Sequence, residues 1–530
     1  MKQSKHILTL LLAGWLAGIV PAIASAELNL IPWPAQVTPG DGTFALTEQT
    51  AVVADSAFAR EAAALAVDLH LTNTVATSQK RIELTTRGAE GLAEEAYQLE
   101  VRPAGVTIRA ISSAGAFYGC QTLKQLLDAS ARTIPAVQIA DAPRYAWRGF
   151  LLDVSRHFFD QAAIQREIDW LAGYKLNRLH LHLTDDPAWR LEIQKYPQLT
   201  RTGARGNFSD SNAPAAYFTR AAMRQIIAYA QAQHIVVVPE IDMPGHASAA
   251  TRTFPELDGG VHTFNPGREL TYDFLENVLL EVMDTFPSPW IHLGGDEVDC
   301  TVWNTDPAVA QKLQADGLKS PQQLEQSFVR RMAGFIHDHG RTPVGWDEVA
   351  AAKPVKNTLI FWWRHDRPDV LAAALAGGYD VVLSPRAPCY LDYPQDLTYP
   401  VKGRKLFNTL NAVYRGPEIP ATITAAARQH ILGVEGCVWT ERIATTSYLE
   451  FMTMPRLAAL AEMAWTPEAA RDFTRFDACL KPFLQQYRAA GIHYYDETDP
   501  AGSLHEAIQA APPSARLEKT SRPAAGVVHN

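Results

Sequence analysis

The sequence is poor in cysteine: its five cysteines are scattered over 530 residues and form no Cys-x-x-Cys pair. This scarcity argues against a zinc knuckle and against a dense disulfide scaffold. One disulfide is possible in an oxidising compartment, and at least one thiol then stays unpaired within a monomer. The chain also has no run rich in Lys or Arg, and its formal net charge is −9. Nucleic acid is therefore not an expected partner.

Long apolar runs are absent except at the N-terminus. Residues 1–26 place two lysines before the apolar run Ile7 to Ile23 and end in the small residues 24–26. This pattern is typical of a secretory signal peptide. A retained membrane anchor is the weaker alternative, because the run falls short of the roughly 20 residues that a spanning helix needs. We expect an exported protein, periplasmic or secreted, that has no membrane attachment once the signal is removed.

The remaining sequence has an ordinary globular composition, and its length suggests more than one domain. From 27 to 142, short apolar runs alternate with a helical stretch, which predicts a small α/β (α+β) domain. Pro143 interrupts regular structure, so we place the domain boundary there. A second domain is expected over 143–495. Residues 496–530, rich in Ala, Pro and Ser, are predicted to form a disordered tail.

Within the second domain, short apolar or β-branched runs recur between amphipathic helical segments. The strand candidates are 150–154, 178–183, 235–239, 290–293, 343–346, 358–362, 380–383 and 433–439. Eight repeated βα units predict a (β/α)8 barrel, the TIM barrel. A doubly wound open sheet is the alternative, but no Gly-x-Gly-x-x-Gly follows a first strand.

Acidic residues follow three successive strand candidates, at 185–186, 240–242 and 296–297. One acid after a strand is more often a helix cap or a turn former. Three in succession favour a site, because the C-terminal ends of barrel strands face the active site. The strongest signal is the segment 294–297, where two glycines allow close approach of the backbone to a ligand and Asp296 and Glu297 present two carboxyl groups.

Two adjacent carboxyl groups suit acid–base cleavage of a glycosidic bond. Clustered Asp, Glu and His could instead bind a divalent metal ion. The spacing, however, contains neither His-Glu-x-x-His nor an EF-hand loop. We therefore expect neither a metal ion nor another cofactor.

Four segments carry a resemblance to a known family: 147–149 (Trp-Arg-Gly), 182–186 (His-Leu-Thr-Asp-Asp), 239–246 (Pro-Glu-Ile-Asp-Met-Pro-Gly-His) and 292–297 (His-Leu-Gly-Gly-Asp-Glu). Together they resemble the β-N-acetylhexosaminidases of glycoside hydrolase family 20. The last segment is the most specific, and the resemblance extends from Leu30 to Glu462, nearly the whole mature chain.

The resemblance implies that Glu297 is the general acid and base. It also implies that Asp296 holds the 2-acetamido N–H group of the sugar and stabilises an oxazolinium ion. The acetamide oxygen of the substrate is then the nucleophile of a retaining, substrate-assisted reaction. His246, with Asp185 or Asp186, resembles a relay that tunes the general acid. The implied substrates are chitin oligosaccharides, glycans or peptidoglycan fragments that end in β-linked N-acetylglucosamine or N-acetylgalactosamine.

Further positions resemble the family's sugar contacts. Arg148 matches an arginine that binds ring hydroxyls, although an ordinary salt bridge is the alternative. Tyr390 matches the residue that binds the acetamide carbonyl, and Asp392 and Glu441 match carboxylates that bind hydroxyls. The implied substrate-binding set is Arg148, Asp242, Trp346, Trp363, Tyr390, Asp392, Trp439 and Glu441.

One segment departs from the family pattern, because 407–414 lacks the further pocket tryptophan that often precedes Val-Tyr. Two other readings stay open: a non-catalytic carbohydrate-binding protein on the same barrel, and a metal-dependent deacetylase or phosphohydrolase. The intact Asp296–Glu297 pair favours the hydrolase, because a binding protein needs no acid at the scissile bond. Fold alone does not decide between them. The sequence does not indicate an oligomeric state.

Overall fold

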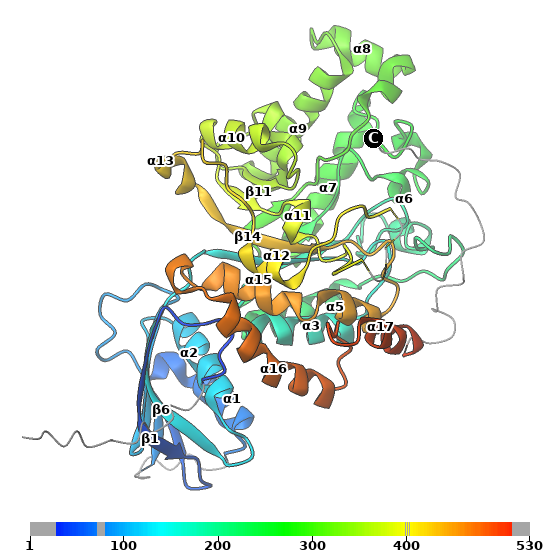
Figure 1. Ribbon diagram of the computed structural model, residues 1–530. Coiled ribbons are helices and arrows are strands. Elements are labelled where there is room, and N and C mark those ends of the chain that lie inside the picture. Colours follow the sequence, from blue (N-terminus) through cyan, green and yellow to red (C-terminus); the bar gives the residue numbers. More distant parts are fainter. Residues whose placement is uncertain (1–27, 72–79, 398, 400, 402, 511–530) are drawn as a thin grey trace, which may run out of the picture.

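The computed structural model describes residues 28–71, 80–397, 399, 401 and 403–510. The predicted signal peptide therefore lies outside the described residues. Figure 1 shows a blue N-terminal domain beside a green and yellow barrel, with the orange helices α15 (Arg456–Trp465) and α16 (Phe473–Ala489) near their junction. In the described part of the chain, no helix has the length and apolar character needed to cross a membrane.

The N-terminal domain is a six-stranded mixed sheet with the strand order β1-β6-β4-β5-β3-β2. Its strands are β1 Gln36–Ala45, β2 Ala51–Ala54, β3 Arg81–Thr85, β4 Tyr97–Arg102, β5 Gly105–Arg109 and β6 Thr133–Asp141. Helices α1 (Ala59–Asp68) and α2 (Ser113–Leu126) pack on this sheet, and α2 begins where the Ser112 hydroxyl accepts the Gly115 N–H. The expected small α/β domain is confirmed.

The second domain is a closed parallel barrel of eight strands. The strands are β7 Trp147–Asp153, β8 Arg178–His182, β9 Val236–Glu240, β10 Trp290–His292, β11 Thr342–Trp346, β12 Leu359–Trp362, β13 Val381–Leu383 and β14 Ile431–Val438. Pairing of β14 with β7, from Gly433 opposite Trp147 to Val438 opposite Leu152, closes the ring. Each strand overlaps a predicted one, so the TIM-barrel prediction is confirmed.

Amphipathic helices surround the barrel. In α3, for example, Ile164, Ile168 and Leu171 are buried at helical spacing, and the Asp160 carboxylate caps the first turn. The longer helices are α3 Gln161–Gly173, α5 Arg220–Ala232, α7 Glu269–Thr285, α8 Pro307–Ala315, α9 Pro321–Asp338, α10 Pro368–Ala376, α14 Thr446–Thr453, α15, α16 and α17 Pro500–Gln509. Short helices are α4 Gln198–Arg201, α6 Ser248–Thr251, α11 Arg386–Cys389, α12 Leu410–Arg415 and α13 Ala425–Arg428, with 3-10 turns at η1 Ser56–Phe58, η2 Pro255–Leu257, η3 Cys300–Thr305, η4 Asp347–Ala352 and η5 Glu468–Ala470.

Helix α17 corrects the expectation of a disordered tail from 496 onward. Asp499 caps this helix, its Oδ1 accepting the Gly502 N–H at 3.0 Å. Ala507 is buried, and its carbonyl accepts a hydrogen bond from Ser447 of α14 at 2.8 Å. A capping residue and packing against a distant helix therefore outweigh the Ala- and Pro-rich composition. Residues 511–530 of the predicted tail lie outside the described residues.

The five cysteines are all buried free thiols. The disulfide that the sequence left possible does not form between them in this structure. The hydrophobic core, not a covalent bridge, holds the described chain together.

Candidate active site

The loop after β10 carries the two predicted catalytic acids. Gly294, Gly295 and Glu297 all have positive φ angles, of 70°, 92° and 52°. A Cβ atom at Gly294 would lie 1.6 Å from Asp242 Oδ1, so a larger residue does not fit there. The strand ends at His292, and this irregular backbone allows the neighbouring side chains of Asp296 and Glu297 to approach the same imidazole, whereas neighbours in a regular strand point to opposite faces.

That imidazole belongs to His246. Its Nε2 lies 3.6 Å from Asp296 Oδ2 and 3.7 Å from Glu297 Oε2. The Asp296 side chain is 13% exposed and the Glu297 side chain is 50% exposed. The Asp296 carboxyl group is therefore largely buried in the pocket, whereas the Glu297 carboxyl group is accessible to solvent.

Asp185, not Asp186, supports His246 from behind. Asp185 Oδ1 lies 3.2 Å from His246 Nδ1, and Asp185 Oδ2 lies 2.8 Å from His182 Nε2. Asp186 instead accepts hydrogen bonds from Ser248. Burial by itself would lower the pKa of His246, but the carboxylates of Asp185, Asp242 and Asp296 outweigh burial and hold that pKa well above its ordinary value.

Asp242 and Asp296 form a pair of buried acids. Burial, with a smaller contribution from the nearby Glu297 and Glu240 carboxyls, raises the pKa of Asp296 to about 7, and the His246 imidazole opposes this rise. Burial and Asp296 likewise hold the pKa of Asp242 well above its usual range. Asp242 Oδ2 and Asp296 Oδ1 are buried without a hydrogen-bond partner among the described residues. A ligand that brings N–H or O–H donors would satisfy both oxygens.

Aromatic side chains from several strand ends lie together in one buried cluster. The rings of Trp346 and Trp439 are 5.8 Å apart, and those of Tyr390 and Trp439 are 6.1 Å apart. Trp346 Nε1 donates a hydrogen bond to Glu240, and Trp363 Nε1 donates one to Glu348. The cluster contains Trp346, Trp363, Tyr390, Tyr393 and Trp439. Indole faces of this kind pack well against sugar rings.

The structure corrects the expectation for Arg148. This residue stands near the start of β7, fully buried, and its Nη1 lies 2.8 Å from Glu95 of the N-terminal domain. Its guanidinium also donates to the backbone carbonyls of Lys175 and Tyr145. It therefore joins the two domains at the end of the barrel opposite the acids, and it cannot contact a sugar in the pocket.

The arginine in the pocket is Arg156, which sequence reasoning missed. Its Nη2 lies 2.5 Å from Asp185 Oδ2, its Nη1 lies 3.4 Å from Asp153, and its guanidinium lies 5.1 Å above the Trp439 ring. Arg156 follows the C-terminal end of β7, and the strand-end rule used for the acids could have identified it. Arg404, beside Asp392 and Glu441, was also missed, because it lies on a long connection that no strand pattern marks.

Several of these side chains could also be considered as metal ligands. Four groups of three place their ligand atoms within 4.8 Å of one another. Three groups lie in the pocket and share Asp185, Asp242 or His246; the fourth, His180 with Glu240 and His292, is buried inside the barrel. Asp185 and Glu240 are already paired with arginine or imidazole groups. Acid–base chemistry at Asp296 and Glu297 needs no ion.

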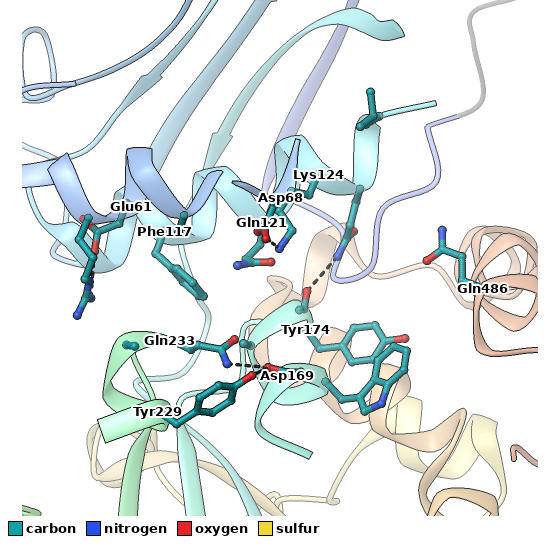
Figure 2. Close-up of a pocket in the computed structure, with 18 of the residues that line it drawn as sticks. Glu61, Asp68, Phe117, Gln121, Lys124, Asp169, Tyr174, Tyr229, Gln233 and Gln486 are labelled. Atoms are coloured by element: carbon teal, nitrogen blue, oxygen red, sulfur yellow. Dashed lines mark hydrogen bonds and ion pairs between the residues drawn. The ribbon is translucent and has the colours of Figure 1, made fainter. Parts of the chain in front are cut away.

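A separate cavity of about 700 Å³ lies between α1 and α2 of the N-terminal domain and the barrel helices α3 and α5 (Figure 2). Its polar groups largely satisfy one another. Asp169 accepts hydrogen bonds from Tyr229 and Gln233, and Lys124 forms an ion pair with Asp68. None of the predicted site residues lines this cavity.

Comparison with known proteins supports the resemblance to glycoside hydrolase family 20 over nearly the whole chain. The model of the glycosyl hydrolase family 20 catalytic domain matches residues 145–468, and that of family 20 domain 2 matches residues 27–142. The chain is 33% identical to a β-N-acetylhexosaminidase of Cellulomonas fimi, over 88% of this chain and 96% of the relative. It is 32% identical to a β-hexosaminidase of Porphyromonas gingivalis, again over 88% of this chain, but spans 64% of that relative's length.

Solved structures are similar as well. An exo-β-N-acetylglucosaminidase from Vibrio harveyi, in complex with N-acetylglucosamine, superposes with a TM-score of 0.82 at 31% identity, covering 90% of this chain and 80% of that one. A mutant β-hexosaminidase of Streptomyces plicatus, in complex with N-acetylglucosamine, superposes with a TM-score of 0.78 at 31% identity. The superposition covers 89% of this chain and 97% of that one.

The barrel, the acids at its strand ends and these similarities define a glycoside hydrolase. More particularly, the chain belongs to glycosyl hydrolase family 20.

Proposed function

We propose that this chain is an exo-acting β-N-acetylhexosaminidase that removes terminal β-linked N-acetylglucosamine or N-acetylgalactosamine from oligosaccharides. Chitin fragments, glycans and peptidoglycan pieces are the proposed substrate classes. The observation that carries the proposal is the position of His246 Nε2, within 3.7 Å of both Asp296 and Glu297, beside a cluster of tryptophans. The two relatives and the two solved structures described above are hexosaminidases or an N-acetylglucosaminidase, and this similarity supports the same activity.

In the proposed reaction, the exposed Glu297 donates a proton to the glycosidic oxygen as the leaving group departs. The acetamide oxygen of the substrate attacks the anomeric carbon from the other face. Asp296 accepts a hydrogen bond from the acetamide N–H, for which its unpartnered Oδ1 is suited. Its negative charge also stabilises the oxazolinium ion. Water, deprotonated by Glu297, then opens that ion, so that the product retains the β configuration.

The decisive test is release of 4-nitrophenol from its N-acetyl-β-D-glucosaminide by protein that begins at Glu27. We expect Glu297→Gln to lower kcat by at least about 100-fold, because a positioned general acid contributes about that much. Glu256→Gln, which alters an exposed acid of η2, is the matched control and should leave kcat unchanged. Turnover should survive a chelator, and the first product seen by NMR should be the β anomer.

Other outcomes would select other functions. A wild type that binds the sugar in calorimetry but releases no nitrophenol would be a carbohydrate-binding protein. Chelator-sensitive loss of acetate, without free aminosugar, would indicate a metal-dependent deacetylase. An α anomer as the first product would replace the retaining mechanism with an inverting one.

We also propose that the chain is exported, on the pattern of residues 1–26. N-terminal sequencing of the protein recovered from the periplasm or the medium should begin near Glu27. Full-length protein retained in the cytoplasm would contradict this proposal.

A further inference from the structure

Asp392 and Glu441 share one cation. Arg404, from the connection between α11 and α12, places Nη2 2.6 Å from Asp392 Oδ2 and 3.1 Å from Glu441 Oε2. Its guanidinium also lies 5.3 Å above the ring of Tyr393, a member of the aromatic cluster of the site. One nitrogen therefore bridges two carboxylates that follow different barrel strands, β13 and β14.

Burial of these three side chains makes the ionisation of the two carboxyl groups depend on Arg404. The Asp392 residue is 3% exposed, and the side chains of Glu441 and Arg404 are about one-fifth exposed. Two carboxylates in such a setting repel each other, and one of them tends to take up a proton. Burial raises the pKa of Asp392 to about 6, and Arg404 opposes that rise. The arginine thus favours two ionised carboxylates side by side.

Ionised carboxylates accept hydrogen bonds and donate none, so a ligand at this end of the pocket has to bring donors. Sugar hydroxyls can donate such hydrogen bonds. An anionic substituent on the sugar would instead be repelled by the Asp392 and Glu441 carboxylates, which share the positive charge of Arg404. Arg156 also lowers the pKa of Glu441, but its guanidinium is paired with Asp185 and Asp153, whereas Arg404 contacts both Asp392 and Glu441.

We propose that Arg404 is a positioning residue that sets specificity, holding Asp392 and Glu441 as a pair of acceptors for the hydroxyls of an uncharged terminal sugar. The inference rests on the proposed function, in which this pocket binds a terminal N-acetylhexosamine. Arg404 acts through its two partners and takes no part in proton transfer.

The test compares Arg404→Gln with wild type on 4-nitrophenyl N-acetyl-β-D-glucosaminide and on its 6-deoxy analogue. On the full substrate, KM should rise about ten- to hundred-fold, the usual effect of weakening hydrogen bonds to charged groups, and kcat should fall less. On the 6-deoxy analogue, the effect should shrink to within about three-fold, since one hydroxyl is missing already. Arg404→Lys should recover part of the affinity, because it restores the charge.

Lys405→Gln is the matched control, because it removes an exposed positive charge from the same segment. It should leave both kinetic constants unchanged. An unchanged KM in Arg404→Gln would overturn the proposal, as would an equal effect on both substrates. A lower KM would overturn it too, and would mean that the arginine blocks the pocket.

Failure of the proposed function would be visible separately, as wild type without nitrophenol release. Calorimetry with N-acetylglucosamine then compares wild type with Arg404→Gln by affinity alone, and weaker binding by the variant supports the role of Arg404. A wild type that neither hydrolyses nor binds the sugar removes both inferences.

Discussion

Single residues with the same chemistry take different roles according to the charges they face. Asp185 and Asp186 are neighbours in sequence, but Asp185 contacts Arg156, His182 and His246, whereas Asp186 contacts Ser248 and His262. Arg156 and Asp185 form an ion pair, and Asp185 also contacts the His246 imidazole. The protonation of His246 therefore depends on a residue that does not touch the catalytic acids directly.

This dependence predicts the behaviour of Asp185→Asn. The Asp185 carboxylate raises the pKa of His246, so removing its charge should bring that pKa down towards the ordinary value. Protonated His246 is then lost at lower pH, and the alkaline limb of the kcat/KM profile should move to lower pH. We expect kcat to fall about ten- to hundred-fold. Asp186→Asn is the control, and an alkaline limb that stays in place in Asp185→Asn would contradict the assignment.

At the scale of elements, Glu240 joins neighbouring strands just beneath the pocket. From the end of β9, this fully buried carboxylate lies 2.5 Å from His182 of β8, 2.9 Å from His292 of β10 and 2.8 Å from the indole nitrogen of Trp346 on β11. Burial would raise the pKa of Glu240, but the imidazoles of His292, His182 and His180 hold that pKa well below its usual value. The same carboxylate thus orients the Asp185 relay through His182 and the pocket wall through Trp346.

Glu240→Gln should weaken both stability and activity. A glutamine offers one acceptor oxygen and places an N–H₂ donor against groups that also donate, so buried hydrogen bonds are lost. We expect the free energy of unfolding to fall by about 3 kcal/mol, as when a buried ion pair is broken. Urea denaturation measures this fall, with Glu256→Gln as the control. Unchanged unfolding in Glu240→Gln would show that this network is not a structural support.

At the scale of the whole molecule, the N-terminal domain contacts the end of the barrel opposite the acids. Arg148 pairs there with Glu95, and Lys175 of the barrel pairs with Asp141 at the end of β6. Arg148, Lys175 and Asp141 are buried between the two domains and Glu95 is partly buried, so each charge depends on a partner from the other domain. The N-terminal domain therefore supports the barrel without entering the pocket.

Replacing Glu95 by alanine tests this division of roles. The variant leaves the buried Arg148 guanidinium without its carboxylate, which should lower stability by about 2 kcal/mol. Because the contact lies away from the acids, kcat and KM should stay within about two-fold of wild type. Differential scanning calorimetry and steady-state kinetics give the two readouts, with the exposed neighbour Glu94→Ala as the control. A several-fold rise in KM would restore Arg148 to the sugar site.

Much of the fold could be predicted because its signals are local. Each barrel strand is a short apolar run, and side-chain periodicity separates it from the helices around it. Boundaries were less certain, since β7 begins at Trp147, three residues before the predicted start. The adjacent acids after two glycines could be predicted for the same reason, because the backbone requirement and the chemistry occupy four consecutive residues.

The sequence by itself therefore determined the barrel, the small first domain and the segment that carries Asp296 and Glu297. Tertiary structure alone decided that Arg156 and not Arg148 enters the pocket, that Asp185 supports His246, and that α17 is ordered. It also brought Arg404 to Glu441, 37 residues further along, and Arg148 to Glu95, 53 residues back. No local pattern encodes such pairs, because the partner of a buried charge depends on how strands from distant parts of the chain close into one barrel.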